Sequence, residues 1–246
     1  MRILFLASAH NSLSQRAWIA LTELGHDVEV EVVDSGAAME AAVATHRPDL
    51  VVCPMLKKLI PESVWSTHRC LVVHPGPLGD RGPSSLDWAI ESGAEEWGVT
   101  VLEADGEFDA GAVWASRTFP MRAAGKSSLY RHEVRRAAVE AIVEAMERIV
   151  EPGAAGVRVA GEDRPLMTQE VRAIDWSTDP TETVVRKLRA AEGHPGVLDT
   201  VQGTEFHLFG VHRERELRGA PGAVVAQRDG AICRATTDGA VWITHL

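Results

Sequence analysis

The sequence predicts an α/β domain with a mostly parallel, Rossmann-like sheet, followed by a small antiparallel β-barrel of the OB-like type. Three observations lead to this prediction. Short apolar runs alternate with helical patterns through the first 150 residues, which is typical of a parallel sheet covered by helices. A stretch rich in Gly, Pro and Ala follows, and beyond it short apolar runs are separated by glycine-containing turns. We therefore expect three regions: an α/β domain at residues 1–150, a linker at 151–162, and a helix with a β-barrel at 163–246.

In the first half, apolar residues recur either at helical spacing or in short buried runs. Leu13, Ala17 and Leu21 lie three to four positions apart, and Gly25 then ends the helix that they predict. The same reasoning predicts helices at residues 13–24, 37–45 and 61–65. Strands are expected at residues 3–7, 28–32, 50–53 and 71–73.

The later elements carry clearer start signals. Ser84, with Asp87 three positions on, predicts a cap for a helix at residues 85–92. Asp179, Pro180 and Glu182 similarly predict a capped helix start before the barrel. Two further strands at 97–102 and 112–119, and one long helix at 127–149, complete the first domain.

Composition and charge restrict the functional class. The chain is 45% hydrophobic and 24% charged, as ordinary soluble proteins are, and its net charge of −10 disfavours binding to nucleic acid. Three cysteines without CxxC spacing suit a reducing compartment, and the apolar start is too short for a signal peptide. The histidines show neither HxxxH nor HExxH spacing. We expect a cytoplasmic protein with small-molecule substrates, no membrane span and no metal site.

The strongest candidate for chemistry is His74, which ends the apolar run of residues 71–73 directly before Pro75. Open α/β sheets bind ligands at the carboxyl ends of their strands. Asp109 lies in an acidic, turn-rich loop between two further predicted strands. We expect the two side chains to meet at neighbouring strand ends, where a paired imidazole can polarise a carbonyl or move a proton. Structurally, His74 could instead be a core histidine, and Asp109 a turn former.

A second candidate lies where the first strand leads into the first helix. Polar residues gather there, namely Asn11, Ser12, Ser14 and Gln15. Backbone N–H groups at a helix start favour an anion, although simple capping of the helix explains the same residues equally well. The GxGxxG pattern of dinucleotide-binding folds is missing, so hydride transfer is not supported.

At this point several motifs resemble one family, the 10-formyl-tetrahydrofolate-dependent formyltransferases. In the first domain these are His74-Pro75, Arg81-Gly82-Pro83, Gly98-Val99-Thr100-Val101 and Phe108-Asp109-Ala110-Gly111. In the second part, Ala173-Ile174-Asp175-Trp176-Ser177 and the run AAEGHPG at 190–196 resemble the carboxy-terminal domain of methionyl-tRNA formyltransferase. The resemblance spans nearly the whole chain.

Within that family, the run HPGPLGDRGPSSLDWAI is most similar to the two-part members that serve the maturation of nickel–iron hydrogenases. This resemblance implies that the chain passes a formyl group from 10-formyl-tetrahydrofolate to coenzyme A. An enoyl-CoA-hydratase-like half, continuing beyond Leu246, would then release carbon monoxide from formyl-CoA.

Carried over residue by residue, the resemblance makes His74 and Asp109 the catalytic pair. It places the folate against residues 55–60 and 104–109, with the candidates Met55, Leu56, Lys58, Ile60, Ala104, Asp105 and Glu107. The acceptor is expected beside Asn11, Ser12 and Gln15. Asp109 would orient a protonated His74, which donates to the developing oxyanion.

One position departs from the family. The family has an asparagine two positions before its histidine, and Val72 stands there in this chain. Losing one oxyanion donor typically costs about 10²–10³ in rate. Ser84 or Ser85 is the expected substitute. The alternatives are therefore a different formyl acceptor (a sugar-nucleotide amine or methionyl-tRNA) or a noncatalytic module that binds folate or coenzyme A. The transfer RNA is disfavoured because no cluster of Lys and Arg separates residues 33–36 from the next helix.

Overall fold

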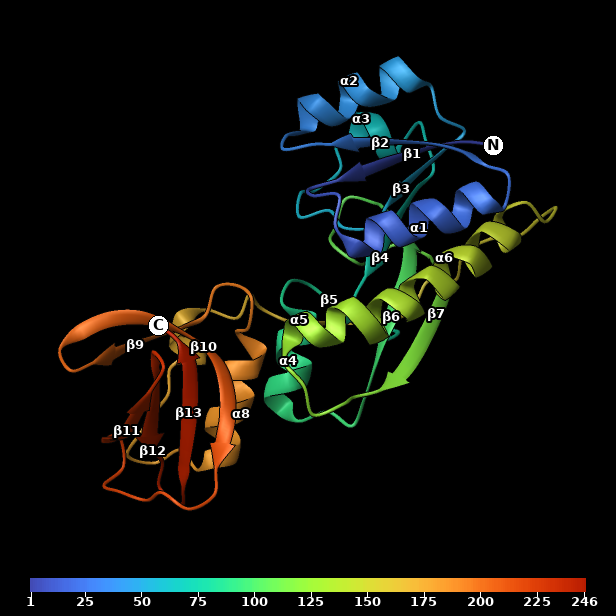
Figure 1. Ribbon diagram of the computed structural model, residues 1–246. Coiled ribbons are helices and arrows are strands. Elements are labelled where there is room, and N and C mark those ends of the chain that lie inside the picture. The colour runs from blue at the N-terminus through green and yellow to red at the C-terminus, as the bar shows by residue number, and fades with distance from the viewer. The chain divides into compact units, whose positions relative to one another are not determined.

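The computed structural model describes residues 1–246, which form two compact units (Figure 1). The first unit combines three segments: Met1–Ser85, Glu96–Pro120 and Tyr130–Arg164. The second unit likewise combines three segments: Leu86–Glu95, Met121–Leu129 and Pro165–Leu246. Neither unit is continuous in sequence, and the segment predicted as a linker, 151–162, belongs to the first.

A six-stranded mixed sheet forms the centre of the first unit, with the strand order β2-β1-β3-β4-β6-β7. Its first four strands pair in parallel, whereas β4–β6 and β6–β7 are antiparallel. The predicted Rossmann-like, mostly parallel sheet is confirmed. Its strands are β1 (Arg2–Ala7), β2 (Asp27–Val32), β3 (Leu50–Cys53), β4 (Cys70–His74), β6 (Glu96–Glu103) and β7 (Val113–Pro120).

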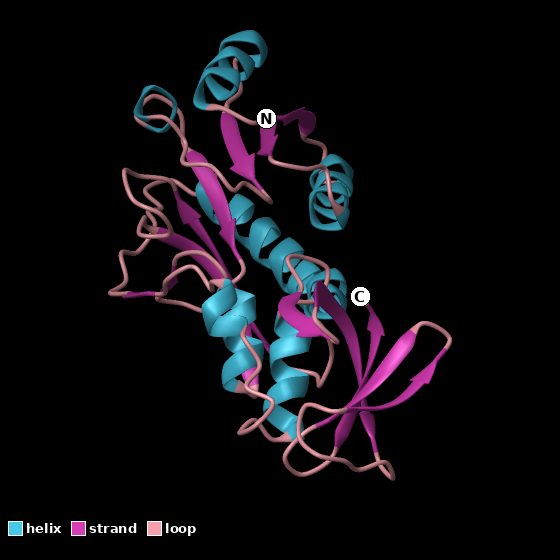
Figure 2. Ribbon diagram, turned by 90° about the vertical axis from the view of Figure 1, so that its left-hand side faces the viewer, coloured by secondary structure: helices cyan, strands magenta, loops and turns pink.

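Helices cover both faces of this sheet, as Figures 1 and 2 show for α1 and α2. On one face α1 (Ser12–Glu23) packs against α6 (Arg135–Ile149). On the other, α2 (Gly36–His46) and α3 (Glu62–Trp65) bury a core that includes Leu4, Leu6, Met39, Val51, Cys53, Ile60 and Cys70. The predicted helix at 127–149 is interrupted: α5 (Lys126–Leu129) and α6 are joined by a π-helical turn, Tyr130–Val134. Such turns often occur at functional sites.

The second unit contains the predicted antiparallel strands, here five in the order β11-β12-β13-β10-β9. The long β10 (Thr204–Glu214) pairs with β9 through its first half and with β13 through its second. Gly210 lies at this transition with a φ of 65°, a conformation that glycine adopts readily. The other strands are β9 (Val197–Val201), β11 (Val224–Arg228), β12 (Ala231–Ala235) and β13 (Ala240–His245).

The expected helix caps are made differently. Helix α8 (Thr181–Ala190) begins where predicted, but Asp238 rather than Asp179 accepts the Thr181 N–H. Asp179 instead pairs with Lys187. Helix α4 (Ser85–Ser92) also begins as predicted. However, Ser84 has a φ of 65°, unlike the extended backbone of an N-cap residue. Asp87 pairs with Lys126, in α5, and with Arg172, in α7 (Gln169–Arg172).

The three cysteines are buried and free. Burial raises the pKa of Cys53 well above its usual range and that of Cys70 to about 12, so neither is a nucleophile at neutral pH. No three His, Cys, Asp or Glu side chains are grouped to hold a metal ion. None of the helices combines the length and apolar character that crossing a membrane requires.

Candidate active site

Strands β1, β3 and β4 run in parallel, so their carboxyl ends share one edge of the sheet. Ser8, directly after β1, donates its N–H to the carbonyl of Met55, beyond the end of β3. The Ser8 hydroxyl accepts the N–H of Lys57. This edge also carries His74, the last residue of β4. It is where ligands of open α/β sheets bind.

His74 is buried and lies between two carboxylates. Its Nδ1 is 3.2 Å from Asp109 Oδ2 and its Nε2 is 2.7 Å from Asp80 Oδ2. The predicted pair of His74 and Asp109 is therefore in contact in the structure. Because a carboxylate only accepts hydrogen bonds, this geometry favours a proton on each ring nitrogen and therefore the imidazolium form.

Asp109 reaches His74 by a route that differs from the expected one. Since β6 is antiparallel to β4, its last residue, Glu103, pairs with Leu71 near the start of β4, whereas Thr100 pairs with His74. The end of β6 is thus about three residues, or roughly 10 Å, from the histidine. The loop after β6 folds back over this distance, and Asp109 adopts a φ of 54° within it. Its Oδ2 also accepts the N–H of Gly82.

Asp80 was not singled out from the sequence. It belongs to the two-residue strand β5 (Asp80–Arg81), which pairs in parallel with β8 (Glu162–Asp163). Its side chain is only 2% exposed, and its Oδ1 lies 2.5 Å from Nε of Arg164. The run Gly79-Asp80-Arg81-Gly82 looks like a solvated turn. One feature of the sequence could have indicated Asp80 as a site residue. It lies six residues after a histidine at a strand end, in a Pro- and Gly-rich loop that has to turn back toward that histidine.

Three side chains fix the loop that follows His74 by donating to its backbone carbonyls. The Ser85 hydroxyl donates to the Pro75 carbonyl, and the Trp97 indole N–H donates to the same carbonyl. Thr100 Oγ1 donates to the carbonyl of Gly76 at 3.0 Å. Gly76 lies against the ring, and a Cβ at this position would overlap both Asp80 Oδ2 and His74 Nε2. Only glycine therefore fits beside the bond between His74 and Asp80.

The neighbouring groups in this cluster shift the pKa values of His74 and Asp80. Burial alone would lower the pKa of His74, but hydrogen bonds to Asp109 and Asp80 outweigh it and raise that pKa to about 9. Burial would likewise raise the pKa of Asp80, but its hydrogen bonds with His74 and Arg164 lower it instead. At neutral pH the site therefore holds a charged imidazole between two carboxylates.

The two predicted folate segments start at different places. Residues 55–60 follow the carboxyl end of β3, whereas Ala104 donates its N–H to the carbonyl of Cys70, at the amino end of β4. Met55, Leu56 and Ala104 are half-buried, and the last two pack against the core under α2. Ile60 lies fully inside that core, so it could contact a ligand only through its backbone. Lys58 and Glu107 are exposed. Asp105 accepts the N–H of Glu107 and pairs with Arg158.

The predicted acceptor residues lie at the start of α1. Asn11 caps the helix by accepting the N–H groups of Leu13 and Ser14, and it donates to the hydroxyl of Tyr130 in the π-helical turn. Gln15 donates to the carbonyl of His10, and Ser12 is the first residue of α1. The structural explanation of Asn11, helix capping, is thus observed. None of the hydrogen bonds of Asn11 or Gln15 leads to His74.

A cavity of about 480 Å³ adjoins this helix start within the first unit. Its lining joins α1, the π-helical turn and α6 through Arg16, His132, Glu133, Arg135, Arg136, Val139 and Glu140. Three arginines thus line this cavity. One of them, Arg16, directly follows Gln15, which was predicted to bind the acceptor.

Val72 occupies the position of the expected asparagine. Side chains alternate along a strand, so Cys70, Val72 and His74 share one face of β4. Val72 packs against the core and offers no donor. Of the two expected substitutes, Ser85 is 2% exposed and its hydroxyl is bonded to Pro75. The Ser85 hydroxyl therefore does not point its hydrogen toward His74.

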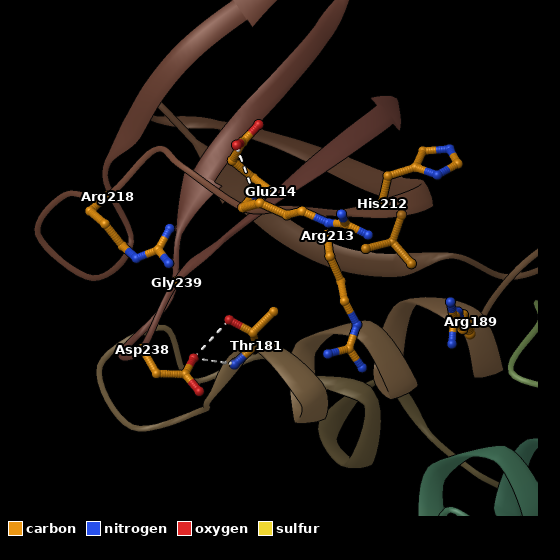
Figure 3. Close-up of a pocket in the computed structure, with 10 residues that line it drawn as sticks. Thr181, Arg189, His212, Arg213, Glu214, Arg218, Asp238 and Gly239 are labelled. Atoms are coloured by element: carbon orange, nitrogen blue, oxygen red, sulfur yellow. Dashed lines mark hydrogen bonds between the residues drawn. The ribbon is translucent and has the colours of Figure 1, made fainter.

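A second cavity, of about 600 Å³, lies within the second unit (Figure 3). Arg189, Arg213 and Arg218 line it. Its carboxylates are already bonded: Asp238 caps α8, and Glu214 accepts backbone N–H groups of the following loop, which lower its pKa to about 2. None of the predicted site residues lines this cavity.

Comparison with known proteins identifies the class. The sequence model of the formyl transferase family matches residues 32–146, and that of the formyl transferase C-terminal domain matches residues 166–246. The chain belongs to the formyl transferase family, as its motifs predicted.

Particular relatives refine this. Hydrogenase maturation factor HoxX of Bradyrhizobium diazoefficiens is 50% identical over 255 residues, which cover 100% of this chain and 44% of that protein. HypX from Aquifex aeolicus, solved in complex with tetrahydrofolic acid, has 48% identity and a TM-score of 0.95, covering 99% of this chain and 43% of that one. The chain thus spans less than half the length of these relatives. A methionyl-tRNA formyltransferase from Clostridium thermocellum, at 15% identity and a TM-score of 0.69, shares the fold.

Proposed function

We propose that this chain transfers a formyl group from 10-formyl-tetrahydrofolate to coenzyme A. In this proposal it carries out the first half-reaction of carbon monoxide production for hydrogenase maturation, and an enoyl-CoA-hydratase-like half beyond Leu246 carries out the second. The observation that carries the proposal is the buried His74 at the carboxyl edge of the sheet, in contact with Asp80 and Asp109, in a chain 50% identical to HoxX.

The residues at this edge suit a folate. Leu59 and Phe108, in the two predicted folate segments, are 47% and 56% exposed, so both side chains are available to cover an aromatic ring. The folate supplies the formyl group. His74 donates a hydrogen bond to the formyl oxygen as negative charge develops there. Asp109 and Asp80 keep the imidazole charged.

The cavity beside α1 supports coenzyme A as the acceptor. The guanidinium groups of Arg16, Arg135 and Arg136, beside Glu133 and Glu140 in the same lining, can pair with phosphates such as those of coenzyme A. Sugar nucleotides and transfer RNA carry phosphates too, so the product assay below decides among these acceptors. We expect Arg136→Ala to raise the KM for coenzyme A about tenfold while the KM for the folate stays unchanged. Steady-state kinetics with each substrate varied in turn checks this. A parallel rise in both constants would contradict a role in acceptor binding.

Val72 favours a second candidate function, a module that binds folate or coenzyme A without turnover. Incubation with 10-formyl-tetrahydrofolate and coenzyme A, followed by mass spectrometry, separates the two functions. Formyl-CoA and tetrahydrofolate in equal amounts support the enzyme. Bound folate with no product supports the module, and formylation of a sugar-nucleotide amine or methionyl-tRNA in place of coenzyme A points to a different acceptor.

The substitution Val72→Asn tests the family position directly. An asparagine here lies on the face of β4 that carries His74 and can donate to the oxyanion. We expect formyl transfer to an amine acceptor to rise by about tenfold, below the full effect of one donor because the surrounding groups are not arranged for an amide. Product formation is measured beside Val72→Leu, which is close to asparagine in size and carries no donor. An equal response of both variants would contradict the assignment.

A further inference from the structure

The Nε2 side of the His74 ring is closed. Asp80 Oδ2 lies 2.7 Å from Nε2, and the Asp80 side chain is only 2% exposed. The backbone of Gly76 lies against this bond so closely that even a methyl group would overlap both of its atoms. Thr100, itself buried, holds Gly76 through its carbonyl. A substrate oxygen therefore has no room at Nε2.

The Nδ1 side has a different environment. The contact with Asp109 is longer, at 3.2 Å, and the Asp109 side chain is 11% exposed. The residues before it, 106–108, are exposed. Asp109 Oδ2 has a second donor, the N–H of Gly82 at 3.1 Å, so this carboxylate keeps a partner if Nδ1–H turns to another acceptor. Nδ1 is therefore the nitrogen that can exchange its partner.

We propose that Asp80 is a positioning residue for formyl transfer: held by Arg164, it fixes the imidazole through Nε2, so that the Nδ1–H of His74 is the donor presented to the formyl oxygen. This inference rests on the proposed function. Arg164 occupies the other oxygen of Asp80, which leaves the carboxylate one orientation. The charged groups that face His74 are thus Asp80 and Asp109, with Arg164 behind Asp80.

An imidazolium carries a proton on each of its two nitrogens, so His74 in this form cannot accept the proton of the nucleophile. The acceptor must therefore lose its proton to solvent, which suits a thiol better than an alkylamine because its pKa is nearer neutrality. In the transfer the carbon–sulfur bond forms and the carbon–nitrogen bond breaks. His74 gives a proton to the departing nitrogen and regains one from solvent. The charge on the ring takes the place of the amide donor missing at Val72.

The test uses Asp80→Asn in the 246-residue chain, with the histidine rings labelled with ¹⁵N and the His74 signals assigned by their loss in His74→Gln. In the unsubstituted chain we expect both nitrogens to be protonated at neutral pH, with deprotonation near pH 9. In Asp80→Asn we expect deprotonation at lower pH by about one unit or more, and a fall in kcat of about 10²-fold with little change in the affinity for tetrahydrofolate.

Two further variants make the result interpretable. Asp199→Asn is the matched control, because Asp199 also pairs with an arginine, Arg234, but in the five-stranded sheet of the second unit. It should leave the His74 titration unchanged. Gly76→Ala should reproduce the Asp80→Asn titration by displacing the carboxylate, and it serves if Asp80→Asn does not fold.

The proposal is overturned if Asp80→Asn lowers only the melting temperature, or shifts the titration without lowering kcat. If the unsubstituted chain forms no product with any acceptor, the proposed function fails. The ring titration still decides whether Asp80 fixes His74, because it needs no turnover.

Discussion

Replacing His74 with alanine is expected to lower the rate of formyl transfer by at least about 10³-fold. The substitution removes the only cation within hydrogen-bonding distance of both Asp80 and Asp109, and with it the donor to the formyl oxygen. The measurement is single-turnover conversion of 10-formyl-tetrahydrofolate with coenzyme A. Retained turnover would exclude His74 from the chemistry.

The control for this variant is its stability. Without the imidazole, two buried carboxylates face each other with only Arg164 as a counterion, and breaking a buried ion pair costs about 3–5 kcal/mol. His74→Gln retains a donor of similar reach and should lose less. Both are compared at a temperature where circular dichroism shows them folded. If activity loss tracks unfolding rather than the loss of the ring, the catalytic role is contradicted.

The order of strands and helices follows from local patterns. Apolar runs such as Leu50–Cys53 and the spacing of Leu13, Ala17 and Leu21 depend only on neighbouring residues, and the structure forms elements there. Capping was harder to predict. Asp238 reaches Thr181 from the turn between β12 and β13, 57 positions away, and such a partner leaves no local signal.

In the site, too, residues held by distant parts of the chain could not be predicted from local patterns. His74 could be found because a strand end followed by Pro75 is a local feature. Asp109 could be found because its acidic, turn-rich loop between two predicted strands is local too, and the family motif also contains it. Asp80 could not, because its burial depends on pairing between β5 and β8 and on Arg164, 84 positions later. A charged residue between glycines looks solvated until the segment that covers it is known.

The charged state of His74 also makes the stability of the fold depend on pH. The usual pKa of 6.5 describes the unfolded chain, and the folded value is about 9. A group whose pKa is raised by folding stabilises the fold fully below the unfolded value and loses that contribution as the pH rises through the folded value. The gap corresponds to about 3 kcal/mol, so the free energy of unfolding should fall by about that amount between pH 6.5 and pH 9.

His74→Gln isolates this contribution, because glutamine does not titrate and all other ionisable groups are unchanged. Urea unfolding at intervals from pH 6 to pH 9.5 gives the difference between the two proteins. We expect the advantage of the unsubstituted chain to be largest at the acidic end and to shrink steadily toward pH 9.5, since the imidazolium that joins Asp80 to Asp109 is then lost. Parallel curves would mean that His74 is neutral in the folded chain, and a neutral ring could donate through only one of its two nitrogens.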